Sequence, residues 1–218
     1  EAIIRANSTI AVRNCVCRQE RALLDEGCGK PLETCLSFGN GAQNTAVAGK
    51  GRLISQDEAL AIVARAKRAG LVLQQANSKN PSFLCACCGC CCGVLRHIKQ
   101  YKNPAALVSN DFTAHYDFDL CLDCGVCVER CPMEAITSDN DMTFHQERCI
   151  GCGLCISEGP TEAVTLVRKA DFDLADIPNN TLDTYLRLGK ARSKLGVGKI
   201  AGMAFKSGVD RVIAPRKK

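Results

Sequence analysis

The spacing of hydrophobic residues along the chain predicts a mixture of helices and short strands. Residues 55–69 give the clearest signal, because their apolar side chains recur at the spacing of one helix face. Ser55 and Glu58 have the spacing of a capping box, and Gly70 is placed to end the helix. Residues 8–14 alternate between apolar and polar positions, which is typical of a strand.

Weaker patterns predict further helices and strands outside residues 112–169. Further helices are expected at Arg18–Glu26, Pro31–Phe38, Gly93–Gln100 and Leu182–Leu195. A strand is expected at Leu71–Leu73, and the segment Asn40–Gly51, which is rich in glycine and alanine, is expected to be a loop. The sequence has no apolar run of about eighteen residues, so it encodes no transmembrane helix.

Residues 112–169 contain an internal repeat with a period of about thirty residues. Each copy has a strand, a run of cysteines and a second strand. The four strands are expected at Tyr116–Asp119, Ala135–Ser138, Met142–His145 and Ala163–Val167. The repeat indicates two copies of one cluster-binding half.

Seventeen cysteines set the chain apart from ordinary soluble proteins. Six of them fall within residues 85–92, where Leu, Ile or Val would pack a core without the risk of oxidation. Adjacent cysteines rarely form a disulfide without strain, and the odd total leaves one thiol over. We therefore expect iron–sulfur clusters or zinc sites, with a disulfide scaffold as the weaker alternative.

The first cysteine run of the repeat has the spacing of an iron–sulfur motif. It follows the pattern C-x2-C-x2-C-x3-C-P with Cys121, Cys124, Cys127, Cys131 and Pro132. Over about sixty residues the repeat resembles the bacterial ferredoxins with two [4Fe–4S] clusters, in which the fourth cysteine of a run serves the other cluster. Zinc is disfavoured here, because a zinc site does not need three thiols on such a loop.

The second run departs from that family at its fourth position. It keeps the other members of the pattern, Cys149, Cys152, Cys155 and Pro160, but residue 159 is glycine. With cross-ligation, the three cysteines of this run and Cys131 complete one cluster, and the three remaining cysteines of the first run lack a fourth thiolate. We expect there a [3Fe–4S] cluster, or a labile [4Fe–4S] cluster whose fourth iron binds water, a solvent thiol or a carboxylate such as Glu158.

Ten more cysteines precede the repeat: Cys15, Cys17, Cys28, Cys35, Cys85, Cys87, Cys88, Cys90, Cys91 and Cys92. Two Cys-Cys-Gly triplets among them resemble the motif of heterodisulfide-reductase-type subunits, which bind non-cubane clusters. Over nearly its whole length the chain also resembles a set of uncharacterised 4Fe–4S dicluster proteins. The shared features are C-x-C-R at residues 15–18, the Cys28/Cys35 pair, a Glu-Ala-Leu helix at residues 58–60, the block at residues 85–92 and the ferredoxin pair. Members of that set often carry an additional N-terminal region.

We expect residues 15–35 to fold back against residues 85–92, with the helix at residues 55–69 as the spacer. The pooled thiols would hold one cubane and a second centre, or one larger cluster, and a zinc site at the first four thiols is the alternative. Cys15 and Cys17 would face the same side of an extended segment. Arg18 is either a hydrogen-bond donor to a cluster or an exposed surface residue.

These assignments predict an α+β chain with three parts. Residues 1–110 form a Cys-rich, mainly helical domain; residues 111–170 form a two-cluster ferredoxin-like domain with a βαβ repeat; and residues 171–218 form a basic C-terminal extension. Glu1 rather than Met begins the sequence, so a missing N-terminus or a cleaved signal peptide is a further expectation. The resemblance to the dicluster proteins with an additional N-terminal region implies a missing N-terminal domain.

The C-terminal extension ends in a strongly basic segment. Residues 187–218 contain ten basic residues and one acidic residue, whereas the net charge of the whole chain is only +5. The extension is either a solvated appendage or a docking surface for an acidic redox partner or a membrane. Nucleic acid is a weaker candidate, because aromatic residues are not interleaved with the charges.

The combined features predict a cytoplasmic electron-transfer protein. Its ferredoxin unit would exchange electrons with an unusual N-terminal iron–sulfur centre. Two alternatives are a redox enzyme, or a subunit of one, whose N-terminal cluster binds substrate, and an iron–sulfur redox sensor. No catalytic residue is assigned, because the sequence contains no nucleophile triad, phosphate-binding glycine loop or carboxylate pair.

Overall fold

The computed structural model describes residues 1–138, 141–156, 159–170, 177–193 and 196. Its helices and strands mix in the α+β manner expected from the sequence, with three small sheets. Within the part of the chain that the structure describes, no helix is long and apolar enough to cross a membrane.

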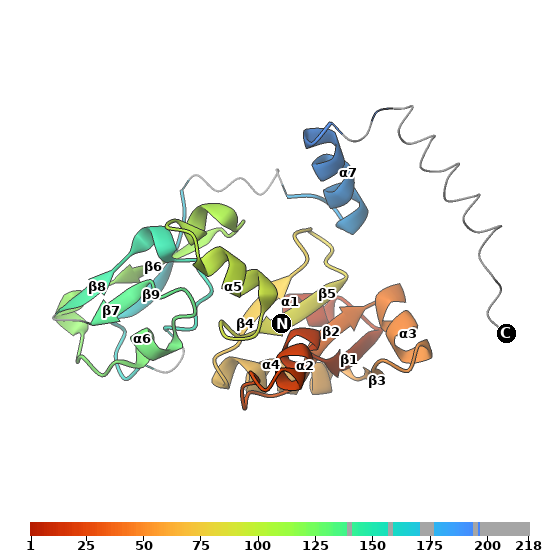
Figure 1. Cartoon of the computed structure of the whole chain (residues 1–218), viewed down its shortest axis with the longest axis horizontal. Helices are drawn as coiled ribbons and strands as arrows, with labels where there is room; N and C mark the ends of the chain where they lie inside the picture. The colour runs from red at the N-terminus through yellow and green to blue at the C-terminus, as the bar shows by residue number, and fades with distance from the viewer. Residues whose placement is uncertain (139–140, 157–158, 171–176, 194–195, 197–218) are drawn as a thin grey trace.

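A five-stranded antiparallel sheet forms the centre of the N-terminal region (Figure 1). Its strand order is β3-β1-β2-β5-β4. The strands are β1 (Ile10–Asn14), β2 (Glu33–Phe38), β3 (Arg52–Ile54), β4 (Val72–Gln75) and β5 (Phe83–Cys87). The helices of this region are α1 (Ala2–Arg5), α2 (Val16–Leu23), α3 (Asn40–Val47), α4 (Gln56–Arg68) and α5 (Gly93–Lys99).

Helix α4 covers one face of this sheet and confirms the strongest sequence prediction. The Ser55 side chain accepts a hydrogen bond from the Glu58 backbone N–H at 3.1 Å, which caps the helix as its sequence predicted. Its buried face packs against β1 and β2 in a hydrophobic core of Ile4, Ile10, Val12, Leu36, Phe38, Ala59, Ile62 and Leu84. The predicted strands near residues 8–14 and 71–73 and the predicted helix after Cys92 are also confirmed.

Three local predictions are wrong, and the sheet explains the first of them. The predicted helix Pro31–Phe38 is strand β2, whose backbone pairs with β1 on one side and β5 on the other. The expectation of a mainly helical region missed this sheet, because pairing with distant strands overrides local helix signals. Helix α3 replaces the loop expected at Asn40–Gly51. The strand expected at Tyr116–Asp119 ends at Tyr116.

The cysteine repeat folds into two two-stranded antiparallel sheets. Strand β6 (Phe112–Tyr116) pairs with β9 (Val164–Arg168), and β7 (Ile136–Ser138) pairs with β8 (Met142–Phe144). Short helical turns precede the cysteine loops: η2 (Phe118–Leu120) and η3 (Gln146–Arg148), with η1 (Pro104–Leu107) and α6 (Val126–Arg130) nearby.

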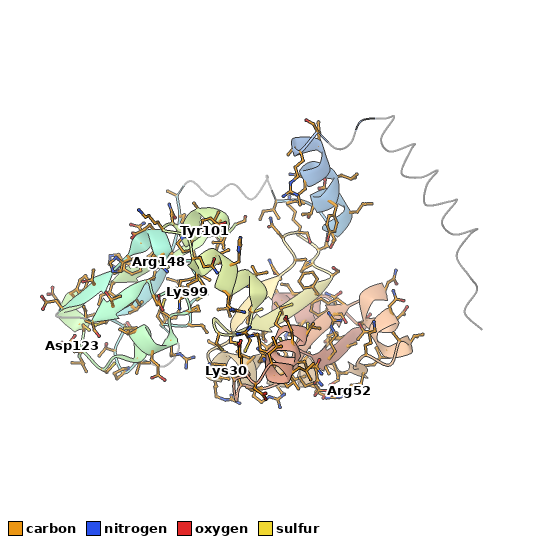
Figure 2. All side chains as sticks on the ribbon, viewed as in Figure 1. Lys30, Arg52, Lys99, Tyr101, Asp123 and Arg148 are labelled. Atoms are coloured by element: carbon orange, nitrogen blue, oxygen red, sulfur yellow. The ribbon has the colours of Figure 1, made fainter. Side chains whose placement is uncertain are left out.

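Two arginines fix the cysteine repeat against the N-terminal region. Arg130 at the end of α6 donates hydrogen bonds to the carbonyls of Lys67 (2.8 Å) and Arg68 (3.3 Å) at the end of α4. Arg148 donates in the same way to the carbonyls of Lys99 (3.2 Å) and Tyr101 (3.3 Å) at the end of α5. Figure 2 labels these three residues near one another. The last carbonyls of a helix lack partners within it, so both guanidinium groups bind where acceptors are free.

Helix α7 (Thr181–Ala191) contacts the loop between β4 and β5. The backbone N–H of Lys79 donates to the Pro178 carbonyl at 2.8 Å, and the Thr184 hydroxyl donates to the Asn77 carbonyl at 3.0 Å. This helix begins one residue before the predicted segment 182–195 and covers it as far as Ala191; residues 194–195 are outside the described residues. Most of the basic residues of the C-terminal extension also lie outside them.

Candidate metal centres

The cysteine block at residues 85–92 is divided between two groups of thiols. Cys85 and Cys87 lie two positions apart on β5 and share one face of the sheet, whereas the following Cys88 turns to the other face. Cys91 and Cys92 are divided in the same way between two hydrophobic clusters. Each Cys-Cys-Gly triplet therefore contributes thiols to two centres rather than to one.

The four-thiol group consists of Cys28, Cys88, Cys90 and Cys91. Their sulfur atoms all lie within 4.8 Å of one another. The shortest separations are 3.6 Å between Cys91 and Cys28 and 3.8 Å between Cys28 and Cys88. Only one face of this group meets solvent, since Cys90 is exposed while Cys88 and Cys91 are buried. A converging set of four thiols can hold either an iron–sulfur cluster or a single tetrahedral metal ion.

The six-thiol group lies on the other face of the sheet and consists of Cys15, Cys17, Cys35, Cys85, Cys87 and Cys92. The Cys35 and Cys85 sulfur atoms are 3.8 Å apart on neighbouring strands. Cys87 forms hydrogen bonds with both Cys85 and Cys92, and Cys17 lies close enough to Cys92 and Cys85 to interact with their charges. Cys15 caps α2 and Cys17 lies in its first turn, so the extended C-x-C segment expected from the sequence is instead a helix start.

Both groups contain thiols that readily become thiolates. A hydrogen bond from Cys35 is the main cause that lowers the pKa of Cys85 to about 3, and one from Cys87 lowers the pKa of Cys92 to about 6. Burial opposes ionisation of Cys88, but hydrogen bonds from Cys90, the Cys91 backbone and Arg18 outweigh it and lower its pKa to about 7. Thiolates are the form in which cysteine binds metal.

Arg18 is buried beside the four-thiol group, with a relative exposure of 2%. Its guanidinium donates to the Ala86 carbonyl at 3.0 Å, to the Cys88 sulfur at 3.8 Å and to the Thr34 hydroxyl. Its Nε is buried and has no hydrogen-bond partner among the described residues. Of the two roles considered from the sequence, this position excludes the exposed surface residue and fits a donor to sulfur. An orphaned buried donor beside four thiols is also what a bound anionic cluster would satisfy.

The cross-ligated group, Cys131, Cys149, Cys152 and Cys155, lines one cavity in the cysteine repeat. Burial raises the pKa of Cys152 to about 11 and that of Cys155 to about 12, and the charges of Cys131 and Cys149 add to both shifts. Cys131, from the first run, thus lies in the same cavity as the three cysteines of the second run. This is the arrangement that the resemblance to the two-cluster ferredoxins implies.

The three-thiol group, Cys121, Cys124 and Cys127, lines a second cavity together with Gly159 and Pro160. Cys155 lines both cavities, so the two sites of the repeat are adjacent. The position where a fourth cysteine would stand therefore faces the three thiols but offers no ligand. Glu158, considered above as a carboxylate ligand, lies outside the described residues.

One hydrophobic cluster joins the six-thiol group to the cross-ligated group. Its buried members include Cys87, Cys92 and Met133, and Cys85, Cys131 and Cys152 pack against it from its edges. At the same junction a Cβ on Gly89 would lie 3.2 Å from both Cβ and O of Pro132, so the cysteine block touches the residue after Cys131. The two centres are thus connected by packed side chains and not by solvent.

The structure confirms that residues 15–35 approach residues 85–92, through the contacts of Cys28 and Cys35 with the block. It does not keep the first four cysteines together, because Cys28 lies in a different group from Cys15, Cys17 and Cys35. A zinc site made of those four is therefore not present in this arrangement. The signal that sequence reasoning missed was the adjacency of cysteines, since neighbours in extended backbone face opposite sides.

Comparison with known proteins identifies the cysteine repeat. Residues 114–166 match the family model of the 4Fe-4S dicluster domain. No curated protein and no solved structure matches the chain. The chain thus contains a 4Fe-4S dicluster domain with the [4Fe–4S] clusters and electron-transfer chemistry that this class implies.

Proposed function

We propose that this protein transfers electrons between its dicluster domain and a second iron–sulfur centre held by the six-thiol group. Residues 111–170 act as the ferredoxin-like domain, and the ten thiols of residues 1–110 bind two further centres, one for each thiol group. The sulfur atoms of the four-thiol group converge within 4.8 Å, and those of Cys35 and Cys85 in the six-thiol group are 3.8 Å apart. Each group also contains at least one thiol with a lowered pKa, so the donor sets fit iron–sulfur centres. When bound, iron–sulfur clusters supply reversible one-electron chemistry.

The observation that carries the proposal is the shared hydrophobic cluster between Cys85, Cys87 and Cys92 on one side and Cys131 and Cys152 on the other. Side chains at this junction exclude water, and exclusion of solvent is one of the factors that sets the potential of a cluster. The Arg130 and Arg148 hydrogen bonds hold the two regions in this position. The chain's own residues therefore fix the two centres next to each other.

The exposed end of the dicluster domain is the proposed entry for electrons. Cys124 is exposed, and exposed apolar side chains surround its loop: Phe118 (53%), Leu120 (50%) and Leu122 (67%). Asp123 lies at the same tip in Figure 2. We propose that a redox protein docks at this tip, with the basic C-terminal extension adding electrostatic attraction to an acidic partner or a membrane surface.

The relay is tested by removing the cross-ligated centre alone. In Cys152→Ser, the dicluster domain loses a ligand of the cross-ligated group, and electrons that enter at the three-thiol group should no longer reach the six-thiol centre. In the anaerobic variant, a reduced bacterial ferredoxin should reduce the six-thiol centre at least tenfold more slowly than in the wild type. Freeze-quench EPR measures this rate. The control Ser138→Ala changes a strand residue that is not a thiol. Equal rates in the variant and the wild type would refute the relay.

A second candidate function is an oxidoreductase that binds its substrate at the centre held by the four-thiol group. A cleft beside this group supports it. The exposed thiol of Cys90 faces this cleft together with Cys131 and Pro132. Basic side chains dominate the charged lining, which consists of Lys30, Arg68, Lys99, Arg130 and Glu129. A cleft of this charge between two thiol groups suits a small anionic substrate.

Anion binding separates this candidate from a carrier without a substrate. If the cleft binds anions, millimolar sulfite added to the reduced protein should change the EPR spectrum of the centre held by the four-thiol group. Arg68→Gln should weaken that response several-fold. Arg65→Gln is the matched control, because Arg65 lies one turn earlier on α4 and is absent from the lining of the cleft. A spectrum that sulfite leaves unchanged would exclude an anion site at this cleft.

A further inference from the structure

The hydroxyl of Tyr116 lies directly against the three-thiol group. Its Oη is 3.0 Å from the Cys121 sulfur and 3.8 Å from the Cys127 sulfur. The side chain is buried, with a relative exposure of 8%, and packs with Cys127 and Ile136 in one hydrophobic cluster. The ring of Phe118 stands 4.6 Å from the Tyr116 ring, centroid to centroid, and restricts its movement. A phenol buried in this way needs a hydrogen-bond partner, and the thiols are the partners at hand.

The internal repeat shows that this hydroxyl is specific to the incomplete site. Tyr116 stands five positions before Cys121, and Phe144 stands five positions before Cys149. Phe144 lines the cavity of the cross-ligated group, as Tyr116 lines that of the three-thiol group. The chain therefore places a ring beside each site, but a hydroxyl only beside the one that lacks a fourth cysteine.

We propose that Tyr116 donates a hydrogen bond to the Cys121 sulfur and thereby raises the reduction potential of the cluster held by the three-thiol group. This inference rests on the proposed function, in which that group binds iron. The Tyr116 oxygen contacts two ligand sulfurs, so the geometry favours a donor to sulfur over an iron ligand. A hydrogen bond to a ligand sulfur stabilises the more negative, reduced state.

The direction of the effect gives the two sites of the domain different potentials. The cross-ligated group has a phenyl ring at the matching position and receives no such hydrogen bond from it. The Tyr116 hydroxyl therefore makes the three-thiol cluster the better electron acceptor of the pair. This suits a site that lies next to the exposed Cys124 and takes electrons from a partner.

The test is Tyr116→Phe, which removes one oxygen and keeps the ring. In anaerobic redox titrations followed by EPR, the ratio of reduced to oxidised three-thiol cluster at a fixed potential should fall by about tenfold, which equals 59 mV for a one-electron couple. Iron and sulfide contents should stay at the wild-type level. The reciprocal variant Phe144→Tyr should leave the three-thiol cluster unchanged and raise the potential of the other.

A measurement on the wild type keeps the test independent of how the variant folds. Pulsed EPR in deuterated water should show an exchangeable proton coupled to the three-thiol cluster, and Tyr116→Phe should lack it. An unchanged potential in a variant with full iron content would overturn the role of Tyr116. A wild-type protein without iron at the three-thiol group would instead refute the proposed function, so the two failures are distinguishable.

Discussion

Replacing Gly159 with cysteine should convert the incomplete cluster of the dicluster domain into a four-cysteine cubane. Gly159 lines the same cavity as Cys121, Cys124 and Cys127 and is followed by Pro160, as Cys131 is followed by Pro132. Among the described residues, an added Cβ would meet only the Thr161 carbonyl oxygen, at the ordinary contact distance of 3.5 Å. The backbone therefore accepts a cysteine side chain where the family pattern places one.

The expected result is a gain of about one iron per chain, since a three-iron cluster becomes a [4Fe–4S] cluster. The EPR signal that an oxidised three-iron cluster gives should disappear, and Mössbauer spectra should show two complete cubanes in the domain. The potential of that cluster should fall, because a fourth thiolate adds negative charge. Iron and sulfide analysis of anaerobically prepared protein provides the measurement.

Gly159→Ala is the matched control, because it fills the same space without a thiol and should keep the wild-type iron content. Two complete cubanes in the wild-type domain would show that the ligand assignment at the three-thiol group is wrong. A cysteine variant with wild-type iron content and spectra would show the same for the position of Gly159.

The sequence predicted the dicluster domain better than the N-terminal region. The resemblance to the two-cluster ferredoxins indicated that Cys131 joins the second cysteine run, and the three other ligands of each run lie on a short loop whose geometry is local. The grouping around the cysteine block depends instead on β5, which places Cys87 and Cys88 on opposite faces, and on α2, which begins at Cys15. The position of β5 is not set locally, because part of this strand pairs with β2, which lies more than forty residues earlier in the chain.

The same reason explains the error at β2. Pro31 and Gly39 bracket a stretch of helix length, but its residues lie in the middle of a sheet, where Leu36 and Phe38 pack on α4 and Cys35 faces the six-thiol group. Both faces are covered, so the alternation that marks a half-exposed strand is absent. The loss of ligand at residue 159 was visible in the sequence, whereas the Tyr116 hydroxyl that approaches the same site was not.

Replacing Arg18 with methionine should disrupt the N-terminal centres more than any other single change outside the cysteines. The guanidinium holds Thr34, the Ala86 carbonyl and the Cys88 sulfur together from one buried position. Its removal takes one donor from each of these groups and leaves the thiolates of the four-thiol group without a buried positive charge. Breaking a buried charge pair from one side costs about 3–5 kcal/mol.

The expected outcome for Arg18→Met is a loss of that order in the free energy of unfolding, measured by anaerobic guanidinium chloride titration, and loss of the metal bound by the four-thiol group. Arg18→Lys should recover part of the stability, because it keeps the charge but cannot form the forked contacts. Gln19→Met, at an exposed position of the same helix, is the control and should change neither quantity. If Arg18→Met retained both the metal and the stability of the wild type, the buried guanidinium would be a packing residue and the four-thiol group would be held by its cysteines alone.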